Sequence, residues 1–304
     1  MKKLIYLSIG VAVLTAYSCN KDKDKTSQSV LNITAINDSK SQVVNVKLKS
    51  MEEKTFSIGC RIMLSTIFDA KNKTFGYMDY NNVYRLMNVE TGVEIKQIPL
   101  HESIVFAVVD TIRDVIIGKY FVHGTDKDDG TDHVLIINPN DGSIISDNQF
   151  YVGGTWYPTY FFRDIENEYV LLCAANNALV FIDPYTGNII RTLNLDTELD
   201  NGIYDRKNNR LIGTTYSNGT SKDDGVNYIV TVDLNTGKTL SKVVAQGLSF
   251  YLGEERDYDA ETNCFVLIND NNEVLFFDVA TGQVNEKYPL DFAVTSLKLW
   301  RSDK

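Results

Sequence analysis

Short apolar runs alternate along the chain with clusters of Asn, Asp, Gly and Lys. LVFI at 179–182 and VLFF at 274–277 are typical, and each is followed at once by an aspartate. Runs this short suit buried β-strands, and no segment sustains the 3.6-residue period of an amphipathic helix. The pattern therefore predicts a chain built almost entirely of short strands joined by tight turns.

Five of the polar clusters share one form, in which an Asn or Asp is followed four residues later by Gly. They are NVETG (88–92), NPNDG (138–142), DPYTG (183–187), DLNTG (233–237) and DVATG (278–282). The side chain of the first residue can bond the turn backbone, and glycine supplies the positive φ that a tight hairpin requires. We expect these motifs to be structural, with no chemistry of their own.

An aspartate upstream of each turn sets the length of the repeat. The aspartates are Asp69, Asp110, Asp164, Asp205 and Asp259, and each ends an extended segment. The distance from aspartate to turn glycine alternates between 23 and 32 residues, so the full period is a pair of units 95 residues long. The longer unit carries an acidic insertion, which reads GTDKDDG at 124–130 and GTSKDDG at 219–225. Duplication of a two-unit module explains why this loop occurs twice.

Repeats of this length, with about four short strands each, predict an all-β fold, a β-propeller. A single four-stranded sheet buries both faces only by packing against neighbours in a ring. VLNITAIND (30–38) and QVVNVKLKS (42–50) precede the first complete unit, and FAVTSLKLW (292–300) follows the last. We expect these three strands to form a composite sixth blade that closes the ring by pairing the two ends of the chain. Five and seven blades are the alternatives.

The recurring pattern, an aspartate, spaced Leu and Val positions and a D-x-x-T-G turn, resembles the YVTN/YncE-type propellers. These are related to the quinoprotein amine dehydrogenase-like propellers. The resemblance covers residues 56–290, but the usual PDG of the first turn is missing and the units are longer and paired. It implies a fold in which binding or unknown roles are more frequent than catalysis, and fold alone does not carry function.

The N-terminal segment has the features of a bacterial lipoprotein signal. Residues 1–18 combine a basic start with an apolar stretch too short to span a membrane, and they end before Cys19. The sequence AYSC resembles a lipobox, although Tyr17 is bulkier than usual there. We expect a signal peptide at 1–18, a flexible tether from lipidated Cys19 to residue 28, and one propeller domain at 29–304. The predicted location is the outer membrane of a Gram-negative bacterium, exposed at the cell surface, with the periplasmic leaflet as the alternative.

The composition limits the classes of partner that the protein can bind. The 304 residues carry a formal net charge of −10, which argues against nucleic-acid binding, because the phosphate backbone would be repelled. After Cys19, three cysteines remain, Cys60, Cys173 and Cys264, and an odd number cannot all pair within one chain. We expect them to be small buried residues in strands, and the protein to be a monomer.

Numbering the strands of each unit A to D from the axis outward places the B–C loops and D–A links on one face, and the variable segments fall there. Aromatic residues gather in two of these segments, near a flexible Gly153-Gly154 pair in one and near charged residues in the other. Aromatic faces with a nearby arginine suit a planar or sugar-like ligand, or a protein partner, whereas rings that only plug the channel are the structural alternative. The candidate ligand-binding residues are Trp156, Tyr157, Tyr160, Phe250, Tyr251, Glu254 and Arg256.

The first acidic loop has a weak likeness to a calcium site. Its candidate ligands are Asp126, Asp128, Asp129 and Asp132, but the spacing is one residue short of an EF-hand and the distal Glu is missing. A solvated loop is the interpretation that the sequence favours. His123 and His133 flank the loop, and two histidines without a third ligand make a weak case for zinc.

No G-x-S-x-G, H-E-x-x-H, G-x-G-x-x-G or P-loop motif occurs in the sequence. The leading prediction is therefore a lipid-anchored, non-enzymatic protein that captures a small molecule or glycan, without a cofactor, for an outer-membrane transporter. One alternative is a scaffold that docks another envelope protein. The other is a propeller-fold glycosidase or lyase.

Overall fold

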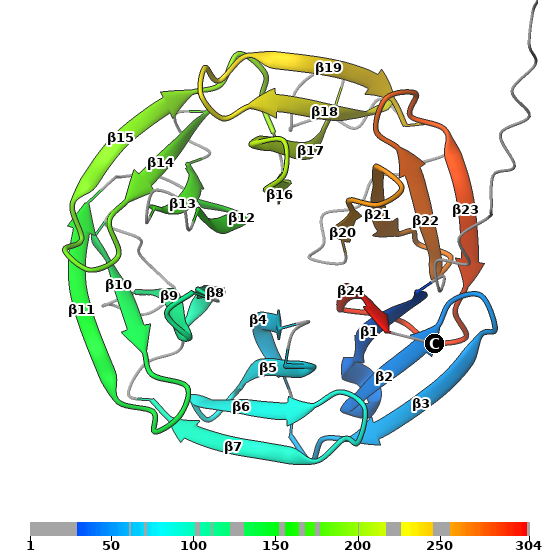
Figure 1. Ribbon diagram of the computed structural model, residues 1–304, viewed down its shortest axis with the longest axis horizontal. Coiled ribbons are helices and arrows are strands. Elements are labelled where there is room, and N and C mark those ends of the chain that lie inside the picture. Colours follow the sequence, from blue (N-terminus) through cyan, green and yellow to red (C-terminus); the bar gives the residue numbers. More distant parts are fainter. Residues whose placement is uncertain are drawn as a thin grey trace, which may run out of the picture.

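Six small antiparallel sheets form a ring in the computed structural model of the chain (Figure 1). The structure describes residues 29–60, 62–69, 72–100, 104–110, 112–121, 131–151, 156–163, 168–173, 177–199, 201–216, 226–245 and 256–302. Each sheet has four strands and lies radially about a common axis, with one strand innermost and one at the rim. The predicted six-bladed β-propeller is therefore confirmed.

The first three blades, with their strands in order from the axis outward, are as follows. Blade 1 consists of β24 (Ser296–Ser302), β1 (Val30–Asn37), β2 (Gln42–Lys47) and β3 (Glu52–Ser57). Blade 2 consists of β4 (Ile62–Asp69), β5 (Thr74–Asp79), β6 (Val83–Asn88) and β7 (Glu94–Pro99). Blade 3 consists of β8 (Val105–Asp110), β9 (Val115–Phe121), β10 (Thr131–Ile137) and β11 (Ile144–Tyr151).

The remaining three blades follow the same order. Blade 4 consists of β12 (Trp156–Arg163), β13 (Glu168–Cys173), β14 (Ala178–Ile182) and β15 (Ile189–Asn194). Blade 5 consists of β16 (Asn201–Asp205), β17 (Arg210–Tyr216), β18 (Asn227–Asp233) and β19 (Thr239–Val244). Blade 6 consists of β20 (Arg256–Asp259), β21 (Cys264–Ile268), β22 (Glu273–Asp278) and β23 (Val284–Pro289).

The apolar runs of the sequence form the middle strands of the blades. Every residue of β13 and β14 is buried, because the next blade covers each face of the sheet. The outermost strands are largely exposed, as β23 shows, and they carry charged residues. An apolar cluster lies at each of the six seams between neighbouring blades. Each blade therefore depends on both neighbours for burial of its core.

The two ends of the chain meet in blade 1, as predicted. β1 pairs with β24 in antiparallel register from Val30↔Ser302 to Ile36↔Ser296. The composite blade has four strands, however, and not the three expected from the sequence. The additional strand is β3, whose sequence EEKTFS is polar almost throughout and therefore lacks the alternation that marks a half-buried strand. Its place at the rim explains why polar residues suffice there.

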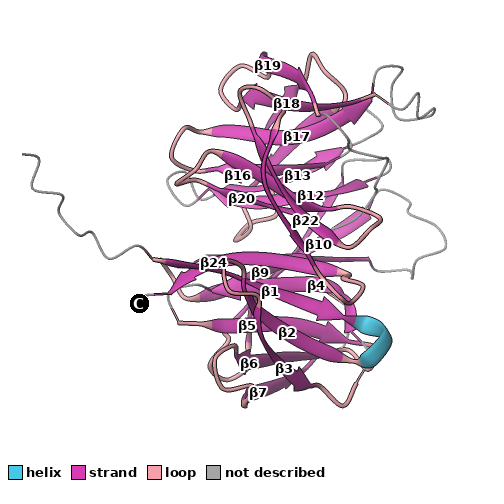
Figure 2. Ribbon diagram, turned by 90° about the vertical axis from the view of Figure 1, so that its right-hand side faces the viewer, coloured by secondary structure: helices cyan, strands magenta, loops and turns pink. Residues whose placement is uncertain are grey.

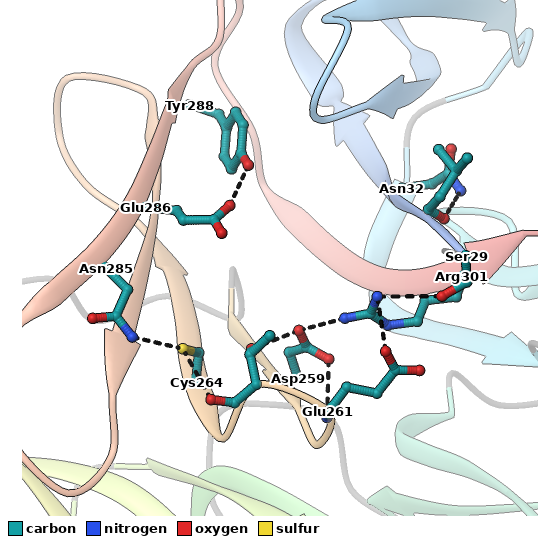
Figure 3. Close-up of polar contacts among 11 residues, drawn as sticks. Ser29, Asn32, Asp259, Glu261, Cys264, Asn285, Glu286, Tyr288 and Arg301 are labelled. Carbon is teal, nitrogen blue, oxygen red and sulfur yellow. Dashed lines mark hydrogen bonds and ion pairs between the residues drawn. The ribbon is translucent and has the colours of Figure 1, made fainter. Parts of the chain in front are cut away.

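A group of polar contacts ties this blade to blade 6 (Figure 3). The guanidinium of Arg301 donates to Asp259 at 2.7 Å and forms an ion pair of 3.0 Å with Glu261. The same guanidinium lies 3.4 Å from the Ser29 hydroxyl, which it can reach as a donor. Asp259 ends the innermost strand of blade 6, so these contacts join the last complete unit to the closing strand.

The recurring turn motifs have the predicted conformation. The five turn glycines have φ between 70° and 77°, and in each turn the leading Asn or Asp accepts a hydrogen bond from a turn backbone N–H group. A Cβ atom at Gly237 would strike the carbonyl oxygen of Asn194 in the preceding blade, and one at Gly282 would strike that of Val244. Glycine is thus required both for the turn and for close contact between blades.

The connections divide between two faces of the ring. We call the side that carries the turns between strands A and B and between C and D the turn face, and the opposite side the loop face. Figure 2 shows the ring from the side, with the short 3-10 helix η1 (Asp38–Lys40), which joins β1 to β2, on the loop face and the C-terminal end on the turn face. Within the described residues, no helix is long and apolar enough to cross a membrane.

Candidate functional site

Buried carboxylates on the turn face hold the turns together. Asp110 accepts hydrogen bonds from the backbone N–H groups of Ile112 and Arg113 and pairs with the Arg113 guanidinium at 2.7 Å. Asp205 likewise accepts from Arg210 at 2.7 Å. These aspartates are the upstream anchors of the repeat, and their contacts support the structural role predicted for them.

A different set of buried polar side chains lies toward the loop face. Its members occupy the ends of strands that meet that face, and all are almost inaccessible to solvent. They are Lys119, Asp132, Asn201, Thr214, Asn227, Arg256 and Ser296. Asn201, Arg256 and Ser296 are the first residues of the innermost strands β16, β20 and β24. The loop-face ends of these three innermost strands therefore carry buried polar residues.

Lys119 and Asp132 form a fully buried ion pair at the seam between blades 3 and 4. Nζ of Lys119 lies 2.9 Å from Oδ1 of Asp132, and neither side chain is exposed. Lys119 is opposite Val134 in the register of β9 and β10, so Asp132 lies on the same side of the sheet, two residues away. Burying two charges carries a large desolvation cost, which makes this pair an unusual feature of an otherwise apolar seam.

The repeat carries an uncharged version of this pair in blade 5. Thr214 and Asn227 stand 95 residues after Lys119 and Asp132, at the matching places on β17 and β18. The Thr214 hydroxyl accepts a hydrogen bond of 2.8 Å from Nδ2 of Asn201. The two copies of the module therefore present the same strand ends with different charge, although their acidic loops are nearly identical in sequence.

Trp156 lies in blade 4, next to the blade that carries the ion pair. It is the first residue of β12 and stands opposite Cys173, whose side chain packs in the apolar cluster that contains Val134. The β12–β13 register is irregular between Trp156 and Tyr160. The backbones of Tyr157 and Tyr160 follow along β12, while the side chains of all three aromatic residues lie outside the described part of the structure.

The second group of candidates belongs to another part of the ring. Phe250, Tyr251 and Glu254 lie outside the described residues. Arg256 is buried at the start of β20 in blade 6, so blade 5 separates it from Trp156 in blade 4. β12 and β20 both begin at the loop face, but Trp156 and Arg256 are not neighbours.

Asp257, next to Arg256, was not singled out from the sequence. Its carboxylate accepts a hydrogen bond of 2.7 Å from the backbone N–H of Leu299 and so joins β20 to β24. Burial raises the pKa of Asp257, and the Lys298 ammonium opposes that increase. A similar link joins β4 to β24, where the hydroxyls of Thr66 and Ser296 lie 2.5 Å apart.

The described residues give the metal hypotheses little support. The carboxylate of Asp132 is engaged by Lys119, so a calcium ion would compete with an ammonium group for it. Asp126, Asp128 and Asp129 lie outside the described residues, as does His123. Nδ1 of His133 lies 2.9 Å from the Tyr120 hydroxyl and 2.8 Å from Oδ1 of Asp147. In the ranges that the structure describes, no group of three or more His, Cys, Asp or Glu residues is arranged to hold a metal ion.

Two of the three cysteines behave as predicted. Cys173 and Cys264 are buried in β13 and β21, whereas Cys60 is half-buried and lies in the link after β3, outside any strand. The prediction of a strand position is therefore wrong for Cys60. This residue lies in a link, where the sequence has no alternation of apolar and polar residues to indicate a strand. Burial raises the pKa of the Cys60 thiol, which disfavours the reactive thiolate.

Cys60 lines a cavity of about 310 Å³ between blades 1 and 2. Tyr77, Arg85 and Glu94 also border this cavity, and Arg85 pairs with Asp79 at 2.9 Å and with Glu94 at 2.8 Å. The arginine charge is thus compensated by two carboxylates. This arrangement stabilises the seam and leaves little free charge for a ligand.

No family model matches the chain, and no curated protein matches it in sequence. The YVTN/YncE resemblance therefore stays a prediction. Many solved structures, in contrast, share the fold. A protein of unknown function from Bacteroides caccae is 11% identical, with a TM-score of 0.63 over 90% of this chain and 100% of its own.

Two further structures extend the comparison. A functionally unknown protein from Desulfotomaculum acetoxidans is 9% identical, with a TM-score of 0.62 over 90% of this chain and 100% of its own. A chain of a nidogen/laminin complex is 12% identical, with a TM-score of 0.62 over 89% of this chain and 98% of its own. At such low identity these likenesses show the fold alone.

Proposed function

We propose that this protein is a lipid-anchored, non-enzymatic binding protein that captures a small molecule or glycan at the loop face. The observation that carries the proposal is the fully buried Lys119–Asp132 pair at the mouth of a seam. Charged pairs are seldom retained in apolar interiors for stability alone, since well-packed apolar residues often serve as well or better. A pair at the base of a variable loop is better explained by a requirement of the site above it.

The proposed ligand is rich in hydroxyl or other polar groups and has a face that can stack on an aromatic ring. Asn201, Arg256 and Ser296 are buried polar residues at the loop-face ends of three innermost strands. Trp156 begins the innermost strand of blade 4, next to the blade that carries the ion pair. Polar groups of this kind fix the orientation of a ligand, while an aromatic ring supplies contact area.

Anchoring through Cys19 agrees with the direction of the chain. The first strand, β1, runs from the turn face at Val30 toward the loop face at Asn37. A tether that ends in a lipid would leave from the turn face, so the loop face would point away from the membrane. That orientation suits capture of a ligand at the cell surface and its transfer to an outer-membrane transporter.

A thermal-shift screen of the protein from residue 19 onward tests the binding role. The probes are glycans, cobalamins, haem and siderophores, and a specific ligand raises the melting temperature. For a probe that does so, calorimetry compares the unaltered protein with Trp156→Ala, which should weaken binding at least about tenfold. Asp291→Asn, on the exposed link between β23 and β24, serves as the control and should leave affinity unchanged.

Two results would contradict the proposal. Unchanged affinity in Trp156→Ala would show that the ligand does not bind at Trp156. Chemical conversion of the bound probe on incubation would indicate an enzyme. Anchoring is tested separately by fractionating cells that express Cys19→Ala. The variant should leave the membrane fraction, and its retention there would show that Cys19 does not carry the anchor.

A further inference from the structure

A cleft of about 520 Å³ opens on the turn face at the seam between blades 2 and 3. Its floor and walls are apolar, and charged and amide side chains stand around its mouth. The apolar part comprises Ile67, Gly76, Tyr84, Leu86, Ile95, Val109, Ile116 and Pro139, and the polar part comprises Asp69, Asn72, Thr74, Lys96, Asp114 and Asn140. The cleft spans from the innermost strand of blade 2 to its outermost strand.

Two residues that border this space are smaller than residues at matching places in other blades, Leu86 in comparison with blades 4 and 6 and Val109 in comparison with blade 5. Leu86 on β6 corresponds to Phe181 on β14 and to Phe276 on β22, and both phenylalanines are buried. Across the seam, Val109 on β8 corresponds to Tyr204 on β16. At the seam between blades 4 and 5 both matching positions therefore carry aromatic residues, whereas blades 2 and 3 carry Leu86 and Val109.

The phenylalanines at the matching places in blades 4 and 6 are each covered by a further side chain. The Arg191 guanidinium lies 3.6 Å from the ring centroid of Phe181, and Tyr288 packs edge-on against Phe276 with centroids 5.9 Å apart. Lys96 stands where Arg191 stands in blade 4, opposite Leu86, and it has no ring there to cover.

Gly76 shapes the inner wall. A Cβ atom at Gly76 would collide with the hydroxyl of Tyr84, whereas the corresponding residues Val170 and Val266 carry side chains that fill their seams. Tyr84 is buried and lies across the glycine. Its ring forms an aromatic wall at the back of the cleft.

The mouth of the cleft is acidic. Asp69 and Asp114 both line it, and no hydrogen bond or ion pair from the described residues engages the exposed Asp114 carboxylate. Lys96 is the one basic residue of the lining, and it lies close enough to Asp141 to lower the pKa of that carboxyl, after the larger effect of hydrogen bonds from Ser143. A carboxylate beside an apolar floor favours a cation attached to an apolar body.

We propose that this cleft binds a small organic cation with an aromatic or branched aliphatic body. The body would contact Leu86, Val109 and the Tyr84 ring, and the cationic group would face Asp114. A volume of about 520 Å³ lies in the usual range for small-molecule sites. The site is distinct from the one proposed above, because it lies on the opposite face of the ring.

Three probes with one ring system test the charge and the apolar body together. Calorimetry or ligand-observed NMR measures binding of tryptamine, indole and indole-3-acetate to the protein from residue 19 onward. Tryptamine should bind saturably, indole more weakly, and indole-3-acetate at least about tenfold more weakly than tryptamine. Absence of tryptamine binding, or equal binding of tryptamine and indole-3-acetate, would overturn the proposal.

Variants that introduce the larger side chains found at matching places in other blades test whether the cleft is the binding site. Leu86→Phe and Val109→Tyr, made separately, introduce residues that the protein tolerates at the matching places and should each abolish tryptamine binding. Asp114→Asn should weaken tryptamine about tenfold and leave indole unchanged. Asp291→Asn is the control. If both cleft-filling variants melt as the unaltered protein does and still bind tryptamine, the cleft is not the site; if one fails to fold, the other decides.

Discussion

Nε1 of Trp300 donates a hydrogen bond of 3.0 Å to the Oγ1 of Thr34, although the two residues are 266 positions apart. The Thr34 hydroxyl donates in turn to Asn45 at 2.7 Å, so the bond belongs to a chain that crosses blade 1 from β24 to β2. The Trp300 ring also packs 6.0 Å from that of Phe68 in blade 2. The Trp300 side chain therefore links strands from both ends of the chain within blade 1 and packs that blade against blade 2.

Removal of the Trp300 ring should destabilise the whole propeller. The Trp300 ring is buried between blade 1, in which the two ends of the chain pair, and blade 2. We therefore expect Trp300→Ala to lower the free energy of unfolding by about 4 kcal/mol. Trp300→Phe keeps most of the packing and loses the hydrogen bond to Thr34, at a cost of about 1 kcal/mol. Urea unfolding followed by circular dichroism measures both. Equal losses in the two variants would mean that packing of the ring contributes little.

The buried pair of Lys119 and Asp132 should behave as one unit. Lys119→Thr leaves a buried carboxylate without its ammonium partner, and we expect a loss of about 3 kcal/mol in the free energy of unfolding. The double variant Lys119→Thr/Asp132→Asn recreates the uncharged pair of blade 5 and should recover part of that loss. A double-mutant cycle in urea measures the coupling. Additive losses would show that the two charges do not depend on each other.

The sequence predicted those features of the fold that depend on residues close to one another within each repeat. The turn glycines such as Gly237 and the anchors such as Asp205 act within a few residues of their own position, so their spacing alone reveals the blades. The closure of β1 on β24 followed from counting strands at the two ends. β3 was missed because a strand at the rim needs no apolar face.

The sites were harder to predict, because they depend on register between segments. Lys119 occurs within the apolar run VIIGKYF and gave no signal of a buried charge until β10 placed Asp132 beside it. The cleft can be recognised only when each of its residues is compared with the residue at the matching place in another blade. In blade 4 the first hairpin lies one residue earlier than the 95-residue repeat predicts, so that Tyr169 pairs with Phe162 as Phe75 pairs with Phe68. A plain offset of 95 residues would therefore align Gly76 with the wrong side of β13.

The turn glycines should tolerate no side chain. Gly237 has a φ of 71°, and an added Cβ would meet the carbonyl oxygen of Asn194 in the preceding blade. We expect Gly237→Ala to lower the free energy of unfolding by at least about 2 kcal/mol, from left-handed strain and loss of contact between blades. Gly59→Ala is the matched control, because nothing lies within 4 Å of its added Cβ, and its effect should stay within about 0.5 kcal/mol. Similar losses in both variants would contradict the role assigned to Gly237.

Acid should weaken the seam between blades 1 and 2 through Asp79. Burial alone would raise the pKa of Asp79, but hydrogen bonds from Arg85 and from the backbone N–H groups of Val83 and Asn81 outweigh burial and lower it. A lowered pKa in the folded state stabilises the protein above the unfolded value of about 3.9, and this contribution is lost as the pH falls through the folded pKa.

Asp79→Asn isolates the charge from the turn. Asn269 holds the matching place in blade 6 and accepts the same two kinds of backbone hydrogen bond, from Asn271 and Glu273, so asparagine should preserve the turn while losing the ion pair with Arg85. We expect a loss of about 2 kcal/mol at neutral pH, measured by urea unfolding. The gap between the variant and the unaltered protein should narrow below about pH 3.9. A gap of the same size at both pH values would show that the Asp79 carboxylate does not supply the pH-dependent part of the stability of this seam.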